Sequence, residues 1–406
     1  MNRIRAARLA DEPRDYQALG LSQGTVEAWE DAFRTAEGGP GTYEWWYFDA
    51  HLNDGSILVI IFYTKGFNES RAKLRPKVSF RWDRPDGTRL KHSIATSAQE
   101  FYADVDNCDV CIGPAKMSAA VDEYRLTIHD GDFRAVITLA RDTPSWRPAT
   151  GHWLFDEDHQ KKFAWLLAVP CGRVTASLDI GGKVEYLQGV GYHDHNWGTV
   201  AMSHLLDHWW WAHTTIGDRT VVVYDLITAR KYGHIQLSTV LIMDGTNVID
   251  DETIESTLSL YPQNSGASAI PDNFTISYHQ GPARARVTFH RRRVILHRRL
   301  IDQLTGARRL LAKLIASQGA YWRFTGTAEM LSDDSSGSPI PVYAASAPCT
   351  WELVDFNGVC DPKPLDRSVG VIRPSKVMAK ALRAGFHRII RRARPRPVGS
   401  RDRVTR

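Results

Sequence analysis

The sequence predicts a mainly β protein built of antiparallel sheets. Short runs rich in β-branched and aromatic residues recur along most of the chain. Tight-turn sequences separate many of them, as Asn53-Asp54-Gly55 does between TYEWWYFDAHL and SILVIIFYTKGF. Barrels or sandwiches are therefore favoured over a doubly wound parallel sheet.

The first half of the chain is expected to begin with a helix and to continue as strands. Residues 24–37 (GTVEAWEDAFRTAE) have a helical composition, and Gly38-Gly39-Pro40-Gly41 would end that helix. Residues 142–163 are expected to form a loop. The other strands expected in this half are VSFRWD, TRLKHSI, YRLTIHD, FRAVITLAR, FAWLLAVP and KVEYLQGVGYHDH.

A second series of strands indicates a second domain of similar size. Its members are HWWWAHTTIG, TVVVYDLITA, QLSTVLIMDG, NFTISYH, ARVTFH, YWRFTGTAEML and CTWELVDF. A length of 406 residues also exceeds what one hydrophobic core usually serves. The expected organisation is a helical lead-in over 1–40, β domains over 41–203 and 204–365, and a basic tail over 366–406.

Two basic segments stand out from this chain, whose net charge is only +5. Residues 373–406 hold 12 lysines and arginines against one acid, and residues 284–316 hold 10 against Asp302. Apolar residues recur at helical spacing in 375–392 and in 300–316. The C-terminal segment predicts a basic helix that lies on an anionic membrane surface; 300–316 either adds to that contact or packs on its own domain. No nucleic-acid-binding motif accompanies these residues, so nucleic acid is not expected as a partner.

The composition favours a cytoplasmic protein attached peripherally to a membrane. Apolar residues make up 43% and charged residues 24%, which is typical of a globular chain. No apolar stretch approaches the roughly 20 residues of a membrane span, and no apolar run follows the first arginines as in a secretory signal. The five cysteines include one C-x-x-C pair, Cys108 and Cys111, without further ligands at zinc-site spacing, so reduced thiols are expected.

The segment GVGYHDHNWG (189–198) concentrates groups that can carry chemistry. His193 and His195 would lie on the same side of a strand, where two imidazoles can chelate a metal ion. The residues after them, NWGTVAMS, contain no acid at a familiar ligand spacing, so no metal is predicted. A hydrogen-bonded structural pair and an acid–base site are the two other interpretations.

Acids embedded among aromatic and β-branched residues favour the acid–base interpretation. Asp194, Asp225, Asp49 and Glu44 have such neighbours. Burial raises the pKa of a carboxyl group, by up to about 3–5 units, and a protonated carboxyl can donate a proton to an electron-rich carbon–carbon double bond. A well-placed aromatic ring stabilises the resulting cation by about 0.5–2 kcal/mol.

Strand alternation divides the aromatic candidates between two faces. One face of EWWYFDAHL combines rings with groups that can move protons, and so suits a pocket: Trp45, Tyr47, Asp49 and His51. Trp46 lies on the opposite face, in register with Glu44, which is either a pocket residue or a buried structural anchor. One face of HWWWAHTT carries Trp209, Trp211 and His213.

Four segments together resemble the acyclic carotenoid 1,2-hydratase (hydroxyneurosporene synthase) family, whose relatives include AttH-type proteins and fungal Diels–Alderases. They are YEWWYFDAHLNDG, GYHDHNWG, WWWAHTTIGDRTVVVYD and WELVDF, in this order between about residues 40 and 360. The resemblance implies two tandem lipocalin-like β-barrel or sandwich domains with a substrate pocket at or near their junction. It also implies a hydrophobic isoprenoid or polyene substrate and neither a metal nor another cofactor.

The resemblance further implies roles for four residues. In the hydratases a histidine and a tryptophan of the HDHNWG segment, and a tyrosine and an aspartate downstream, are thought to matter. The matching residues of this chain are His195, Trp197, Tyr224 and Asp225.

The favoured hypothesis is an enzyme that protonates a double bond of such a substrate. Asp225 or Asp194 would be the general acid, and Tyr224 and His195 would orient it or hold a water molecule. Capture of the cation by water gives an alcohol, and capture by another double bond gives a ring. The residues expected around the substrate are Trp46, Tyr47, Glu44, His193, Asn196, Trp197, Trp209 and Trp211. A pericyclase that needs no strong acid and a non-enzymatic carrier of lipids or pigments are the alternatives.

Overall fold

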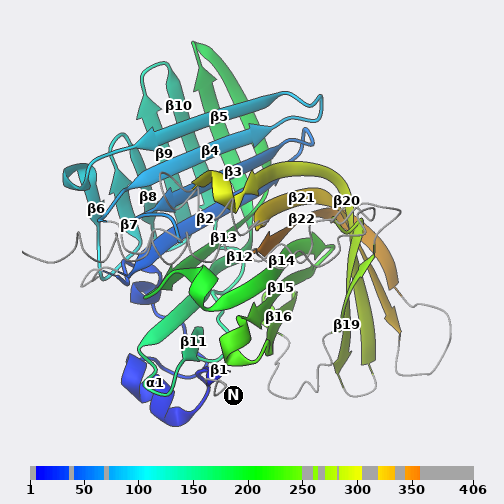
Figure 1. Ribbon diagram of the computed structural model, residues 1–406. Coiled ribbons are helices and arrows are strands. Elements are labelled where there is room, and N and C mark those ends of the chain that lie inside the picture. Colours follow the sequence, from blue (N-terminus) through cyan, green and yellow to red (C-terminus); the bar gives the residue numbers. More distant parts are fainter. Residues whose placement is uncertain are drawn as a thin grey trace, which may run out of the picture. The chain divides into compact units, whose positions relative to one another are not determined.

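The protein is mainly β, as the sequence predicts, and its strands form two antiparallel sheets (Figure 1). The computed structural model describes residues 6–35, 41–67, 73–248, 259–263, 270–280, 283–303, 319–333 and 343–356. Both sheets belong to one compact unit, Met1–Asp361.

Sheet A contains 13 strands of the described chain, in the order β5-β4-β3-β2-β13-β12-β10-β9-β8-β7-β6, and β11 pairs with both β12 and β1. Its strands are β1 (Ala7–Leu9), β2 (Tyr43–Leu52), β3 (Ile57–Tyr63), β4 (Lys77–Asp83), β5 (Arg89–Ala95), β6 (Phe101–Ala103), β7 (Asp109–Ile112), β8 (Ala115–Ala119), β9 (Glu123–Asp130), β10 (Phe133–Ala140), β11 (His152–Phe155), β12 (Lys161–Ile180) and β13 (Lys183–Gly198).

Sheet B contains nine strands of the described chain, in the order β17-β16-β15-β14-β22-β21-β20-β19-β18. Its strands are β14 (Leu206–Ile216), β15 (Arg219–Thr228), β16 (Gln236–Asp244), β17 (Asn247–Val248), β18 (Ser259–Gln263), β19 (Asn273–Gln280), β20 (Ala283–Arg299), β21 (Ala320–Asp333) and β22 (Tyr343–Asp355).

The strands expected from the sequence are confirmed, and so is the first hairpin. β2 pairs with β3 around Asn53-Asp54-Gly55, and Gly55 has the φ of 81° that this turn needs. The loop expected over 142–163 is partly wrong, because it contains β11, which pairs with β12 and β1. The chain passes from sheet A to sheet B between Gly198 and Leu206. The domain boundary at residues 203/204 stays a prediction.

The helix expected over 24–37 is wrong for the part of it that the structure describes. This part contains only a single 3₁₀ turn, η1 (Ala28–Asp31), and the chain is extended at Ala32. The acids of this turn point into the protein, where Glu30 accepts a hydrogen bond from Arg147, and these tertiary contacts outweigh the weak helical preference of the segment. The other short helices of the described chain are α1 (Pro13–Leu19), η2 (Ala98–Glu100), η3 (Met202–His204), η4 (Arg230–Tyr232) and η5 (Leu300–Gln303).

The C-terminal basic segment and the last part of the other basic segment lie outside the described residues. This holds for the whole of 366–406, including the helix predicted over 375–392, and for 304–316. Within the part of the chain that the structure describes, no helix combines the length and the apolar character that crossing a membrane requires.

The two faces of β2 pack into different cores, as the alternation predicts. Trp46 and Phe48 join the core within sheet A, whereas Trp45 and Tyr47 join a cluster made of residues from both sheets. β14 behaves in the same way: Trp209 and Trp211 enter the shared cluster, and Trp210 enters the core of sheet B. Polar contacts also connect the sheets, since His213 on β14 lies 2.9 Å from the buried Asp49 carboxylate on β2.

Candidate functional site

The two faces of β13 divide the HDHN run between two environments. Asp194 and Asn196 point from sheet A toward sheet B and line a pocket. His193 and His195 point the other way, into the interior of the sheet A region. Position 198, at the end of the motif, requires glycine because a Cβ atom there would lie 2.3 Å from the Tyr43 hydroxyl oxygen.

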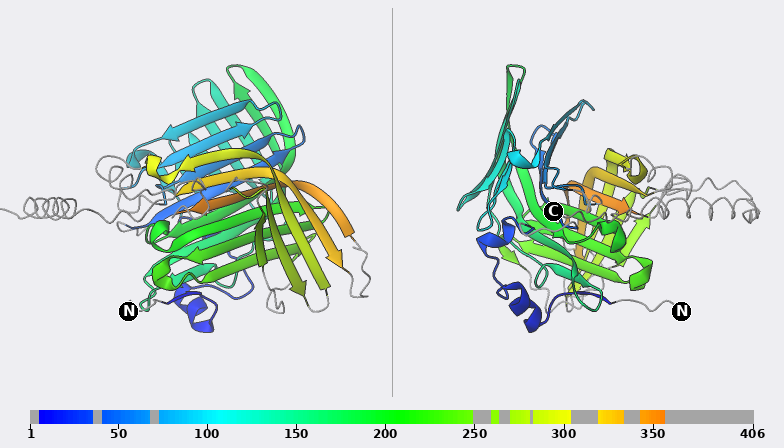
Figure 2. Two further views of the ribbon diagram at one scale, coloured as in Figure 1. Left: turned by 45° about the vertical axis from the view of Figure 1, so that its right-hand side comes forward. Right: turned by 60° about the vertical axis from the view of Figure 1, so that its left-hand side comes forward.

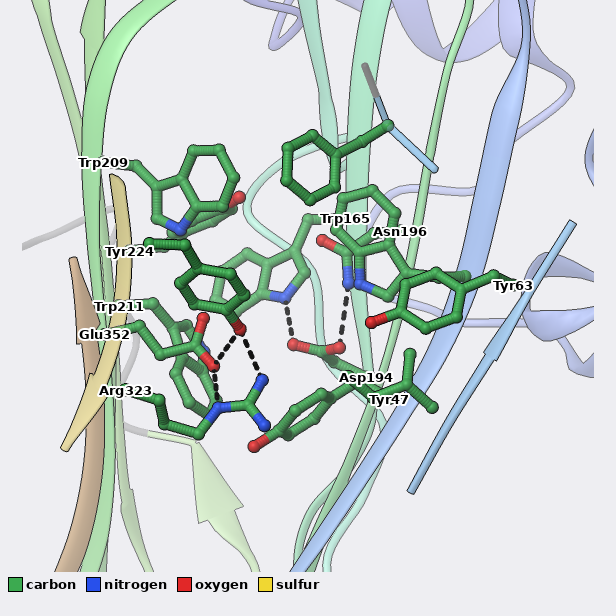
Figure 3. A pocket seen from close by; sticks show the side chains of 14 residues that line it. Tyr47, Tyr63, Trp165, Asp194, Asn196, Trp209, Trp211, Tyr224, Arg323 and Glu352 are labelled. Carbon is green, nitrogen blue, oxygen red and sulfur yellow. Dashed lines mark hydrogen bonds and ion pairs between the residues drawn. The ribbon is translucent and has the colours of Figure 1, made fainter. Parts of the chain in front are cut away.

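The pocket lies between the two sheets and is walled mainly by aromatic rings (Figure 3). It contains about 480 Å³ of space free of protein atoms, including the part open to solvent. We call it the aromatic pocket, and its lining residues are Trp45, Tyr47, Ile61, Tyr63, Phe67, Trp165, Asp194, Asn196, Trp209, Trp211, Tyr224, Tyr321, Arg323 and Glu352.

Asp194 is a buried carboxyl group on the sheet A wall of this pocket. Its Oδ2 accepts hydrogen bonds from Trp165 Nε1 (2.9 Å) and the Tyr192 hydroxyl (2.7 Å), and its Oδ1 accepts one from Asn196 Nδ2 (2.8 Å). Burial raises the pKa of Asp194 to about 6, although the donors Trp165 and Tyr192 oppose this rise. A carboxyl group with this pKa holds its proton over part of the range near neutrality and can release it there.

A relay of donors connects Asp194 to sheet B. The Tyr192 hydroxyl that donates to Asp194 also accepts a hydrogen bond from Trp211 Nε1 at 3.3 Å. Tyr192 and Trp211 lie with ring centroids 5.3 Å apart. The position of the carboxyl group therefore depends on the packing of the two sheets against each other.

A second carboxyl group, Glu352 on β22, lines the opposite wall. It pairs with Arg323 of β21, and its Oε1 accepts a hydrogen bond from the Tyr321 hydroxyl at 2.8 Å. Burial raises the pKa of Glu352, while Arg323 and Tyr321 favour its ionised form. The Arg323 guanidinium lies 4.8 Å from the ring centroid of Tyr47, so this cation connects the two walls.

Tyr224 of β15, the tyrosine that was predicted to orient the acid or to hold a water molecule, lines the pocket. Its ring packs against Trp165 with centroids 4.7 Å apart, and burial raises the pKa of its hydroxyl well above the usual value. The structure gives this hydroxyl no hydrogen-bond partner among the described residues. It is therefore a protonated donor available to a bound molecule.

Asp31 is the centre of the polar cluster behind β13. It accepts hydrogen bonds from the Tyr124 hydroxyl (2.7 Å) and His193 Nε2 (3.2 Å), and its other oxygen lies 3.4 Å from His195 Nδ1. Burial opposes the charged form of His193, but the attraction of Asp31 outweighs it and raises the pKa of His193. Glu44 anchors the second histidine, accepting from His195 Nε2 at 2.8 Å.

This cluster also contains a group that could hold a metal ion. The ligand atoms of Asp31, Cys108 and His193 lie within 4.8 Å of one another, and all three residues are buried. Hydrogen bonds from His193 and from the Cys108 thiol to Asp31 account for their closeness without a metal. Cys111, the other cysteine of the C-x-x-C pair, is not part of the group.

Asp225 faces away from the aromatic pocket. It shares the face of β15 with Val223 and lies opposite Trp210, on the side of the core of sheet B. Gln236 Nε2 donates to its Oδ1 at 2.9 Å, and Ser238 donates to the same atom. Burial raises the pKa of Asp225, but the structure does not bring this acid to the pocket.

The structure therefore divides the predicted site residues into two groups. Six of them line the aromatic pocket: Tyr47, Asp194, Asn196, Trp209, Trp211 and Tyr224. Six others do not line it: Glu44, Trp46, His193, His195, Trp197 and Asp225. The ring of His195 packs between those of Trp46 and Trp197, with centroids 4.7 Å from each.

Seven residues that line the aromatic pocket were not predicted from the sequence, and they come from segments far apart along the chain. The missed lining residues are Ile61, Tyr63, Phe67, Trp165, Tyr321, Arg323 and Glu352. For Glu352 a signal existed, because WELVDF alternates Trp351 and Leu353, which enter the core of sheet B, with Glu352 and Val354 on the other face.

Comparisons with known proteins bear on this fold and site. A sequence model of the carotenoid hydratase family, CrtC, matches residues 98–259. The predicted resemblance to the carotenoid hydratases is confirmed. A hydroxyneurosporene dehydrogenase of Chlorobaculum tepidum is 32% identical over 223 residues, which cover 47% of this chain and 58% of that protein.

A second curated relative comes from a fungus. The quinolone epoxide rearrangement protein penF of Penicillium thymicola is 26% identical over 151 residues, which cover 34% of this chain and 41% of that protein. The chain thus spans less than two thirds of the length of either curated relative.

Solved structures show the same fold at low sequence identity. The structure of CghA with Sch210972 has a TM-score of 0.58 at 12% identity, covering 78% of this chain and 89% of CghA. A putative AttH from Nitrosomonas europaea has a TM-score of 0.50 at 13% identity, covering 80% of this chain and 96% of that one. Kievitone hydratase from Nectria haematococca has a TM-score of 0.50 at 12% identity, covering 82% and 93%.

Proposed function

We propose that the aromatic pocket binds an apolar isoprenoid or polyene and that Asp194 donates a proton to one of its carbon–carbon double bonds. The observation that carries this proposal is a buried carboxyl group, with a pKa of about 6, in the wall of a pocket made mostly of rings. An alkene is a weak base, so it needs an acid that stays protonated near neutral pH. The protein's role would be that of a hydro-lyase or a cyclase.

The aromatic rings would stabilise the carbocation that protonation leaves. Trp165 contacts Asp194 directly, Tyr47 lies beside Asp194 on the paired strand, and Trp209 and Trp211 line the pocket from sheet B (Figure 3). The negative face of an aromatic ring attracts a cation by about 0.5–2 kcal/mol. The Arg323 charge does not oppose this because Glu352 neutralises it at hydrogen-bond distance.

Glu352 would complete the addition of water. In this step the oxygen of a water molecule forms a bond to the cationic carbon, and a proton of that water passes to the Glu352 carboxylate. Tyr224, whose hydroxyl is a free donor and acceptor, would hold the water. Where another double bond of the substrate reaches the cation first, a carbon–carbon bond forms instead and leaves a new cation in the ring. This cation loses a proton from an adjacent carbon to the Glu352 carboxylate, and the product is a cyclic isomer.

The size of the pocket fits the end of a long chain better than the whole of it. The enclosed part of the pocket measures about 50 Å³, and the larger volume of about 480 Å³ includes space open to solvent, so the pocket is too small for a whole ligand of drug size. The terminal isoprene units of a polyene would enter, and the remainder would extend through the open side.

The names of the relatives support the hydration chemistry. The matching family is described as carotenoid hydratase, and a protein of the same fold is a kievitone hydratase. Another relative is named for the rearrangement of a quinolone epoxide, which is compatible with other reactions on this scaffold.

Two other functions make different predictions. A pericyclase would need the shape of the pocket and a few donors, and its rate would survive Asp194→Asn. A carrier of lipids or pigments would bind its ligand stoichiometrically and release it unchanged.

Product analysis in a host that accumulates acyclic polyenes and linear terpenoids tests the proposal. The wild type should yield a compound heavier by one water molecule, or a new isomer, and Asp194→Asn should yield neither. An isomer formed equally by both proteins would contradict acid catalysis and support the pericyclase. Substrate that co-purifies unchanged with both proteins would support the carrier.

We also propose that the basic tail brings the protein to an anionic membrane surface, where such substrates dissolve. The support is its charge, since residues 373–406 hold 12 lysines and arginines against Asp402. Co-sedimentation of the full chain with vesicles containing phosphatidylserine, but not with phosphatidylcholine alone, is expected. Equal sedimentation after truncation at Asp361 would contradict it.

A further inference from the structure

A second cavity, which we call the basic cavity, adjoins the aromatic pocket. Four residues line both spaces: Ile61, Tyr63, Tyr321 and Arg323. The basic cavity contains about 1140 Å³ free of protein atoms, including the part open to solvent. These four side chains form a wall common to both spaces, so a ligand that occupies both must pass between them.

The walls of the basic cavity come from β3, β4 and β5 of sheet A and from β20 and β21 of sheet B. Figures 1 and 2 show β20 (yellow) beside these blue strands of sheet A. Arg89 donates to the Val294 carbonyl at 3.0 Å, and Arg293 donates to the Arg84 carbonyl at 2.8 Å. Two shifts in the register of β20 with β21 lie within Arg291–Leu296, where the strand meets sheet A.

The lining of this cavity is strongly positive. Six lysine and arginine side chains and two histidines line it, and among the described residues no carboxylate does. The cationic and imidazole residues are Lys77, Arg81, Arg89, Lys91, His92, His297, Arg298 and Arg323.

Only some of this charge is neutralised by neighbouring acids. Arg81 and Arg89 share one buried carboxylate, that of Asp83, at 2.5 and 2.8 Å. Lys91 and Arg298 have no ion-pair partner within the described part of the chain. Lys91 lies directly opposite Arg81 on the paired strands, where the Asp83 carboxylate is already bound by Arg81 and Arg89.

We propose that the basic cavity binds an anionic group, a carboxylate or a phosphate, at one end of the substrate whose apolar end occupies the aromatic pocket. This inference rests on the proposed function and narrows its substrate class from neutral polyenes to amphipathic ones. Lys91 and Arg298 would bind the anion directly from the two sheets, and Arg81 and Arg89 would add to the positive field. The basic stretch of β20, unexplained by the aromatic pocket, then has a role in recognition.

Binding of a fluorescent conjugated polyene acid, parinaric acid, and of its uncharged methyl ester tests this inference without requiring turnover. The acid should bind the full-length wild type about tenfold more tightly than the ester, as expected when an anion gains charge-assisted hydrogen bonds. Lys91→Gln/Arg298→Gln should abolish this preference and leave binding of the ester unchanged. The matched control is Arg125→Gln/Arg134→Gln, which removes two exposed cations from β9 and β10, outside the cavity lining.

The outcomes separate this inference from the proposed function. Equal binding of acid and ester to the wild type would overturn the anionic site and leave the apolar pocket standing. Failure of both ligands to bind would overturn both. A preference for the acid that survives in Lys91→Gln/Arg298→Gln would overturn the assigned cavity. Inorganic diphosphate and parinaric acid should compete for the cavity. If the rise in melting temperature that diphosphate causes adds fully to the rise that the acid causes, the two bind at separate sites, which would also overturn the proposal.

Discussion

Asp194 and Glu352 line one aromatic pocket from facing sheets, and burial raises the pKa of both carboxyl groups. Their neighbours differ. Asp194 has neutral donors, an indole, a phenol and an amide, whereas Glu352 has the guanidinium of Arg323. The two carboxyl groups therefore lie in different electrostatic surroundings, neutral at Asp194 and cationic at Glu352, which fits the proposed roles of proton donor for Asp194 and proton acceptor for Glu352.

The raised pKa of Asp194 should appear in the stability of the protein. The pKa of Asp194 is about 6 in the folded state, whereas an aspartate in the unfolded chain has its usual pKa of 3.8. The contribution of Asp194 to the free energy of unfolding therefore falls as pH rises through this window, by about 2 kcal/mol between pH 4 and pH 7. Denaturant unfolding of the wild type and Asp194→Asn at both pH values measures this difference, and a constant difference would contradict the raised pKa.

The indole of Trp165 should set the alkaline limit of activity. Turnover is expected to fall as pH rises through about 6, where Asp194 loses its proton. Trp165→Phe removes a donor that stabilises the carboxylate, so this limit should move up by about one pH unit. Trp153→Phe is the control, since Trp153 packs on Phe163 and Tyr224 without contacting Asp194. A movement to lower pH would refute this role of Trp165.

The Arg323–Glu352 pair should be costly to break from one side only. Glu352→Gln leaves a buried guanidinium without its carboxylate and should lower the free energy of unfolding by about 3–5 kcal/mol. Arg323→Met in the same chain should restore much of that loss. The exposed pair Arg173–Asp142 provides the comparison, where Asp142→Asn should cost at most about 1 kcal/mol. Equal losses at both sites would show that Glu352 is solvated.

The strands and the alternation of the tryptophans could be predicted from the sequence, but the choice between faces could not. Residues 191–196 of β13 are all buried, so burial does not tell which face meets sheet B. The same ambiguity applies to Tyr224 and Asp225, neighbours that are both buried on opposite faces of β15. Arg323 and Glu352 meet only through the pairing of β21 with β22, which no local pattern reveals. The helix expected over 24–37 is wrong for a similar reason. Its acids Glu30 and Asp31 bind Arg147 and His193, which are distant in the sequence.

His195 is expected to stabilise the fold rather than to act on the substrate. Its imidazole is fully buried, bonded to Glu44 and packed between two indoles. His195→Gln should lower the free energy of unfolding by about 2–3 kcal/mol and leave the pH dependence of the remaining activity unchanged. The exposed His129 on β9 supplies the control, and His129→Gln should change neither quantity. Full stability with lost turnover in His195→Gln would place this histidine in the reaction.

Turnover of Asp194→Asn and Asp225→Asn, measured side by side on the polyene that the wild type converts, tests the central claim most directly. Both substitutions remove a buried carboxyl group of raised pKa, but only Asp194 lines the aromatic pocket. Asp194→Asn should lower the rate by about 10²–10⁴-fold while the substrate still binds, and Asp225→Asn should retain most of the activity. Loss of the reaction in Asp225→Asn with activity preserved in Asp194→Asn would contradict the account.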